Sequence, residues 1–148
     1  MSLTSMTSFD STIQTTNVWL RDFMEGLGWQ DRNRAYRAFR AVLHALRDRL
    51  PVEQVAALGA QLPMLMRGFY YEGWHPGRKL RGERRKGEFL AHVARELRND
   101  FDSDPEAIVR QAFQVLSKHI SSGEIEKAKH LLPEEIRSMW AEERTVWF

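Results

Sequence analysis

The sequence predicts an all-α fold, a compact helical bundle of two pseudo-symmetric helical halves related by internal duplication. Apolar residues recur at helical spacing along most of the chain, and no run alternates apolar and polar residues as a half-buried strand does. The second half of the chain also repeats the first at a constant offset of 70 residues. We therefore expect a single helical domain over residues 10–148, preceded by a disordered tail over residues 1–9.

The first half is expected to contain four helices. Asp10 is placed to cap the first helix, and Gly28 to end it, because glycine accepts the left-handed backbone of a helix C-terminus. Asp31 is placed to cap the second helix. Pro51 opens a short third helix and Pro63 a fourth, since proline suits the first helical turn. The apolar residues of the second helix share one face: Ala35, Ala38, Phe39, Val42, Leu43, Leu46 and Leu50.

The chain is expected to divide into a first half over residues 10–72, a basic linker over 73–87 and a second half over 88–142. The second half follows the same plan. Ser103 or Asp104 is placed to cap a helix that has proline in its first turn, and another proline opens the last helix. Both halves are therefore predicted to be helical throughout.

The repeat is the most specific pattern in the sequence. An offset of 70 aligns Leu62-Pro63 with Leu132-Pro133 and holds without gaps over most of both halves. Apolar positions of the first half also meet apolar positions of the second, as Phe39 meets Val109. The period is longer than that of common solenoids, so we expect two packed halves rather than an open array.

Several landmarks resemble a known family. The segment Arg37–Trp74, the pair Phe89-Leu90 and the closing segment from Leu132-Pro133 to Trp140 are similar to the bacterial family called domain of unknown function 2267. The resemblance implies an all-helical bacterial protein. It supplies no activity, cofactor or catalytic residue.

Composition narrows the functional classes. The 148 residues are 43% apolar and 28% charged, which is the ordinary globular range. The absence of cysteine excludes disulfide scaffolds, thiolate metal sites and cysteine nucleophiles. No apolar run approaches the length of a membrane span, and the N-terminus lacks the regions of a secretory signal. We therefore expect a cytoplasmic protein that does not act at a membrane.

Basic residues gather in two places that are candidates for anion contact. Residues 76–87 carry six Lys or Arg against Glu83 alone, and a basic stripe follows the second helix opposite its apolar face. The candidate anion contacts are Arg37, Arg40, Arg47, Arg78, Lys79, Arg84, Arg85 and Lys86. A solvated surface is the favoured interpretation. Nucleic acid is not the expected partner, because the net charge is only +2 and the second half is acidic.

The segment Pro63–Trp74 is apolar on nearly every side, so several of its faces must be covered. Internal burial explains this pattern, and a surface for a protein partner or a second copy is the alternative. The candidate interaction surface consists of Met64, Met66, Tyr71 and Trp74.

Catalytic and metal-binding patterns are weak. Glu88, His92 and Glu96 share one helix face, but the apolar face of that helix indicates that they point outward into solvent. No nucleophile elbow, phosphate loop or zinc motif is present, so we assign no catalytic residue, metal or cofactor. We expect a non-enzymatic helical interaction module. The alternatives are a small-molecule-binding protein with a pocket between the halves and an enzyme with a non-contiguous site.

Overall fold

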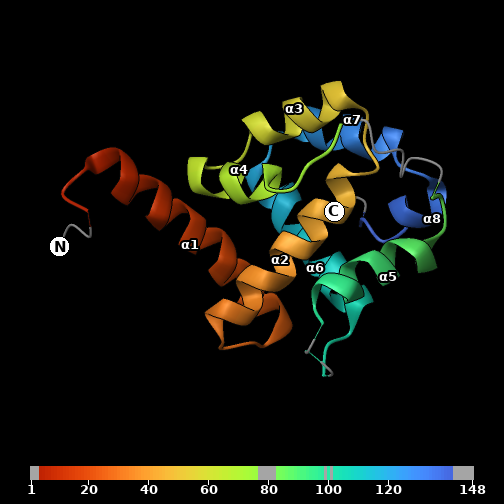
Figure 1. Cartoon of the computed structure of the whole chain (residues 1–148), viewed down its shortest axis with the longest axis horizontal. Coiled ribbons are helices and arrows are strands. Elements are labelled where there is room, and N and C mark those ends of the chain that lie inside the picture. The colour runs from red at the N-terminus through yellow and green to blue at the C-terminus, as the bar shows by residue number, and fades with distance from the viewer. Residues whose placement is uncertain (1–3, 77–82, 99, 101, 142–148) are drawn as a thin grey trace, which may run out of the picture.

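A computed structural model describes residues 4–76, 83–98, 100 and 102–141, and these residues form eight α-helices and no strand (Figure 1). The all-α prediction is confirmed. The helices of the first half are α1 (Thr7–Leu27), α2 (Arg32–Arg47), α3 (Val52–Ala60) and α4 (Met64–Tyr71). Those of the second half are α5 (Lys86–Glu96), α6 (Pro105–His119), α7 (Ser122–Leu131) and α8 (Glu134–Arg137).

Most helix ends lie where the sequence places them. Gly28 ends α1 in the left-handed region, with a φ of 69°. The Asp31 carboxylate accepts a hydrogen bond from the Arg34 N–H and caps α2, and Asp104 caps α6 in the same way. These short polar side chains satisfy backbone N–H groups that have no partner within the helix.

Two predicted boundaries are wrong. The helix α1 begins at Thr7, so the predicted tail over residues 1–9 includes the first three residues of a helix. Asp10 does not cap it. Its carboxylate instead accepts hydrogen bonds from the N–H and the hydroxyl of Thr4, which ties the preceding turn to the helix. The basic linker also ends earlier than predicted, because α5 begins at Lys86.

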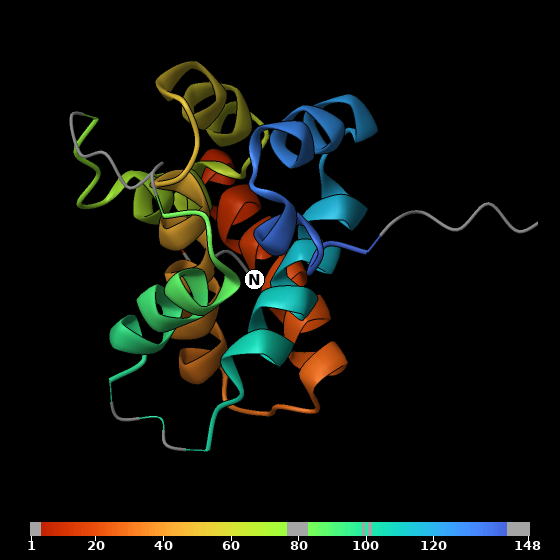
Figure 2. The same ribbon diagram turned by 90° about the vertical axis from the view of Figure 1, so that its right-hand side faces the viewer.

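The centre of the molecule is α2, which packs against α1, α4, α5 and α6 (Figure 1). Helices that are far apart in the sequence lie side by side: α1 packs against α6, and α2 against α5. Figure 2 shows α3 beside α7 at one end of the molecule. The N-terminal part of α1 projects beyond the other helices in Figure 1.

One continuous apolar core joins the helices of both halves. Its aromatic rings meet in defined pairs, such as Phe23 edge-on to Phe39 and Phe113 stacked on Trp140 with ring centroids 4.2 Å apart. The buried Tyr70 hydroxyl donates to the carbonyl of Val55 over 2.8 Å, so its polar end is satisfied. Burial also raises the pKa of Tyr70, so the hydroxyl remains a donor.

Replacing Phe113 with alanine tests this core. Because Phe113 is fully buried and contacts both Trp140 and Phe89, Phe113→Ala is expected to lower the free energy of unfolding by about 3–5 kcal/mol. Urea denaturation measures the loss. Val18→Ala, on an exposed part of α1, serves as the control and is expected to change stability by less than about 0.5 kcal/mol. Equal losses in the two variants would contradict the assignment of Phe113 to the core.

Candidate functional site

The predicted interaction surface on α4 lies partly at the surface and partly in the core. Met64 is 50% exposed, whereas Met66 is fully buried. Tyr71 and Trp74 are half-buried and contact each other, with ring centroids 5.5 Å apart. The assignment of Met66 to a surface is wrong, because α4 packs against α1, α2 and α3 and Met66 lies on the packed side.

An apolar stripe on α1 continues past the covered part of the bundle. Phe9 is 44% exposed, although it stands in register with residues of α1 that are buried. Leu65 of α4 lies beside the stripe, because its N–H donates to Thr12 Oγ1 over 2.9 Å. The stripe has alternating spacings of three and four residues: Met6, Phe9, Ile13, Thr16, Leu20 and Phe23. We define the α1–α4 surface as Met6, Phe9, Ile13, Met64 and Leu65.

A groove of about 480 Å³ runs beside this surface, between α1, α2 and α4. The hydroxyl Oγ1 of Thr16 is buried there and has no hydrogen-bond partner among the residues that the structure describes. The apolar and aromatic part of its wall comes from Ile13, Leu20, Tyr36, Leu65 and Phe69. The groove is therefore an apolar channel that contains one unsatisfied polar group.

The basic stripe on α2 is exposed at one end and buried at the other. Arg37 is exposed, and Arg40 forms an ion pair with Glu72 at 3.4 Å. Arg47 is only 4% exposed, and its Nη1 donates to the carbonyls of Tyr70 and Glu72 at 2.7 and 2.9 Å. The prediction that Arg47 contacts an external anion is wrong, because the end of α4 already occupies its guanidinium.

The linker cations have different surroundings. Arg84 and Arg85 are exposed, whereas Lys86 is half-buried and pairs with Glu106 at 2.7 Å. Arg78 and Lys79 lie outside the described residues. Arg84 and Arg85 therefore stay available as candidate anion contacts, and Lys86 already has an acidic partner.

A buried polar cluster joins the end of α2 to α5. Arg49 donates from Nη1 to His92 Nδ1 at 3.0 Å and to the Ala45 carbonyl at 2.9 Å, and its Nη2 pairs with Glu83 at 2.5 Å. The prediction that His92 points outward is wrong, because α5 packs against α2 and covers this side chain. The cluster links helices from both halves.

His44 connects three helices at one point. Its Nδ1 lies 3.1 Å from Glu96 Oε1 of α5, and its Nε2 lies 2.7 Å from the carbonyl of Phe69 in α4. Each ring nitrogen of this buried residue thus faces an oxygen of another helix. The geometry is that of a structural link rather than of an open catalytic group.

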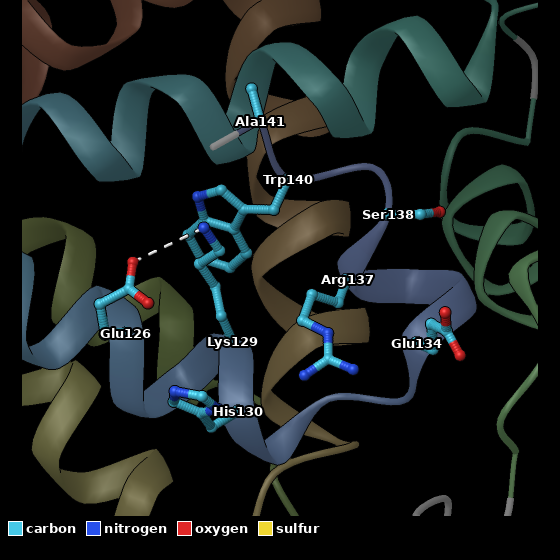
Figure 3. Close-up of a pocket in the computed structure, with 8 residues that line it drawn as sticks. All are labelled: Glu126, Lys129, His130, Glu134, Arg137, Ser138, Trp140 and Ala141. Atoms are coloured by element: carbon cyan, nitrogen blue, oxygen red, sulfur yellow. Dashed lines mark ion pairs between the residues drawn. The ribbon is translucent and has the colours of Figure 1, made fainter. Parts of the chain in front are cut away.

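A pocket of about 590 Å³ lies between α7 and α8 (Figure 3). It has basic side chains inside and acidic ones beside them. Lys129 is 8% exposed, and its Nζ lies 3.6 Å from Glu126 Oε1, beyond hydrogen-bond distance. The lining residues are Glu126, Lys129, His130, Glu134, Arg137, Ser138, Trp140 and Ala141.

Two further classes of site are absent from the part of the chain that the structure describes. No group of three or more His, Asp or Glu side chains among these residues is arranged to hold a metal ion. No helix in the same residues is both long and apolar enough to cross a membrane.

The fold and these sites define an all-α protein whose two halves are joined by buried polar contacts and which carries an apolar surface and a basic pocket. The chain belongs to the family of uncharacterized conserved proteins known as DUF2267, because the family model matches residues 16–139. This match confirms the resemblance carried by Arg37–Trp74 and the closing Leu-Pro segment. No curated protein matches the chain.

Sequence reasoning found only Met64 of the α1–α4 surface and missed the pocket between α7 and α8. The spacing of Met6, Phe9 and Ile13 carries a signal for the first, since it continues the apolar stripe of α1 toward the N-terminus. The pocket of Lys129 and Arg137 has no such signal, because no helical period brings residues of two short helices together.

His92 gives the protein an acid sensitivity that can be measured. Burial, together with the neighbouring Arg49, lowers the pKa of His92 from its ordinary 6.5, although Asp48 and Glu96 oppose the shift. The unfolded chain therefore binds a proton more readily than the folded one, and stability falls as the pH drops below about 6.5. The contribution has a limit of about 1.4 kcal/mol per pH unit.

The measurement compares urea unfolding of the wild type and His92→Gln between about pH 7 and pH 5. The stability advantage of the wild type is expected to shrink as the pH falls, because the variant has no proton to bind at this position. His75→Gln, at an exposed histidine, is the control and is expected to keep the wild-type pH dependence. A constant difference between wild type and His92→Gln over this range would contradict the assigned shift.

Proposed function

We propose that the chain is a non-enzymatic helical interaction module and that the partner of the α1–α4 surface is a second copy of the chain. The observation that carries the proposal is the apolar stripe of α1. Its C-terminal part is buried against the other helices of the chain, whereas Met6 and Phe9 continue it in an exposed position. Contiguous large apolar side chains on a projecting helix are typical of a surface that another helix covers.

The charge of this region supports a contact between identical chains. Asp10 is the only charged residue between Thr4 and Leu20, although 28% of the chain is charged. Depletion of charge is typical of the centre of an interface. Two copies of such a surface approach each other with little repulsion, whereas a strongly charged partner finds no complementary charge on this stretch.

The dimensions of the groove fit the projecting part of α1. The uncovered residues 6–13 span about 10 Å along the helix, and the groove follows α1 over the equal length of residues 13–20. An antiparallel pair centred on Ile13 therefore places the projecting end of each α1 in the groove of the other copy. Such a contact is isologous and closes as a dimer.

The same arrangement offers a partner to the buried hydroxyl of Thr16. In an antiparallel pair centred on Ile13, residue 10 of one copy lies opposite residue 16 of the other. The residue at position 10 is Asp10, and a carboxylate can accept several hydrogen bonds at once. A hydrogen bond from Thr16 then removes an unsatisfied buried group.

We also propose that the chain is an internal duplication whose halves are related by a pseudo-two-fold axis. The offset of 70 relates α3, which begins at Val52, to α7, which begins at Ser122, and Met64 of α4 to Glu134 of α8. It also relates α1 to α5 and α2 to α6. If α1 is equivalent to α5 and α2 to α6, the packing of α1 on α6 and the packing of α2 on α5 are equivalent contacts. Two-fold symmetry requires such a pair of equivalent contacts.

Individual contacts support this relation. His119 lies 2.7 Å from Asp22 and stacks on Trp19, with ring centroids 4.6 Å apart. At the related positions, Arg49 donates to His92 and its guanidinium lies 5.0 Å from the ring centroid of Phe89. An isologous contact inside the chain is consistent with a lineage that once associated as a dimer.

One contact joins two residues that the proposed pseudo-two-fold axis makes equivalent. Gln54 and Glu124 are separated by 70 positions, and Gln54 Nε2 donates to Glu124 Oε2 over 3.3 Å. In a two-fold arrangement, only residues close to the axis contact their equivalents. This contact lies where α3 meets α7.

The mass in solution tests the proposed self-association. The wild type is expected to have twice the mass of one chain by light scattering, and Phe9→Ser to have the mass of one chain, because serine removes the apolar side chain that enters the groove. Val18→Ser is the matched control: Val18 is exposed but lies on the opposite side of α1, so this variant is expected to stay dimeric.

Circular dichroism melting accompanies the mass measurement, since Phe9 is exposed in the single chain and its loss is expected to leave the monomer folded. A monomeric wild type, or a Phe9→Ser variant that stays dimeric, would overturn the proposal. Dissociation by Val18→Ser as well would place the interface elsewhere on α1.

A further inference from the structure

We propose that the pocket between α7 and α8 binds the phosphoryl group of a small phosphate monoester. The pocket shares no residue with the α1–α4 surface, so this inference is independent of the proposed self-association. Its evidence comes from two basic residues of different helices, Lys129 and Arg137, that line one pocket (Figure 3).

Lys129 is the deepest cation of the pocket. A lysine that is 8% exposed pays a large desolvation cost unless its ammonium group is paired and hydrogen-bonded. The nearest carboxylate oxygen, on Glu126, is 3.6 Å away and belongs to a side chain that is 61% exposed. No hydrogen bond holds this ammonium group within the described part of the chain, and an anion in the pocket supplies one.

Arg137 of α8 also lines this pocket, and its side chain is drawn with those of Lys129 and His130 in Figure 3. Its counterpart at the offset of 70 is Arg67, which donates from Nε to the Gly59 carbonyl at 2.9 Å and from Nη2 to the Leu62 carbonyl at 3.0 Å. Arg67 is thereby fixed to the end of α3. The guanidinium of Arg137 has no hydrogen bond to any described residue, so its five N–H donors remain available to a ligand.

The cavity exists because a small residue stands where the first half has a tyrosine. In the first half, Tyr71 lies over Gly59 so closely that a Cβ on this glycine would come within 2.5 Å of the tyrosine hydroxyl. The related positions in the second half are Ala141 and Lys129. The ring that fills this space in one half is thus absent in the other, and a basic side chain replaces the glycine.

The donor set favours a phosphoryl group over other anions. An ammonium and a guanidinium from two helices, with the exposed His130 ring in the same lining, suit a group that has three terminal oxygens. A carboxylate offers only two oxygens in one plane. The exposed Glu126 and Glu134 flank the pocket and repel a polyanion such as nucleic acid, so a small ligand fits best.

Titration with inorganic phosphate tests the inference, with amide NMR shifts in α7 and α8 as the readout at constant ionic strength. The wild type is expected to bind phosphate saturably and more tightly than acetate. Lys129→Gln and Arg137→Gln are each expected to weaken binding by about tenfold or more, the loss of one charge-assisted hydrogen bond. Ala141→Tyr is expected to abolish binding without changing the charge, because it refills the space as Tyr71 does.

Lys127→Gln is the matched control, since this lysine lies on the same helix with a side chain that is 68% exposed. It is expected to bind phosphate like the wild type. The proposal is overturned by a wild type that shows no saturable shift in α7 and α8, by acetate that binds as tightly, by an equal loss in Lys127→Gln, or by an Ala141→Tyr variant that still binds. A melting curve for each variant confirms that it is folded.

Discussion

The structure depends on the burial of α2 on all sides from Ala41 to Arg47. A helix in this position must carry its polar side chains into the core, and each of them needs a partner there. Arg47 donates to carbonyls at the end of α4. The ring nitrogens of His44 contact a carbonyl of α4 and a carboxylate of α5. The positions of α4 and α5 are therefore set by polar groups of α2 as well as by apolar packing.

The local parts of the fold are readable from the sequence. Asp31, Asp104 and Gly28 act at helix ends through their own backbone neighbours, and such short-range chemistry leaves a clear pattern. The burial of Arg47 and His92 cannot be predicted from such local sequence patterns. A basic residue opposite an apolar face has the same pattern whether solvent or another helix covers it, and the cover over α2 comes from distant helices.

The α1–α4 surface and the α7–α8 pocket also differ in how clearly the sequence indicates them. Phe9 belongs to a periodic stripe, but the Ser- and Thr-rich residues around it have the composition of a terminal tail. The α7–α8 pocket is lined by residues of two short helices, with the small Ala141 twelve positions after Lys129. A single sequence does not predict such a pocket. Its apolar pattern indicates which residues fill the core, but it does not indicate where the packing leaves an empty space.

The packing of α1 on α6 and of α2 on α5 has a consequence for how the protein is made. Each half contributes helices whose apolar faces are covered by the other half. At about 5–20 residues per second, the ribosome needs roughly 2–10 s to extend the chain from the end of α2 to the end of α5 and roughly 5–18 s from the end of α1 to the end of α6. During that time, the side chains of α1 and α2 that later meet α5 and α6 have no cover, so the nascent first half is the stage at which this protein is most exposed to chaperones and to aggregation.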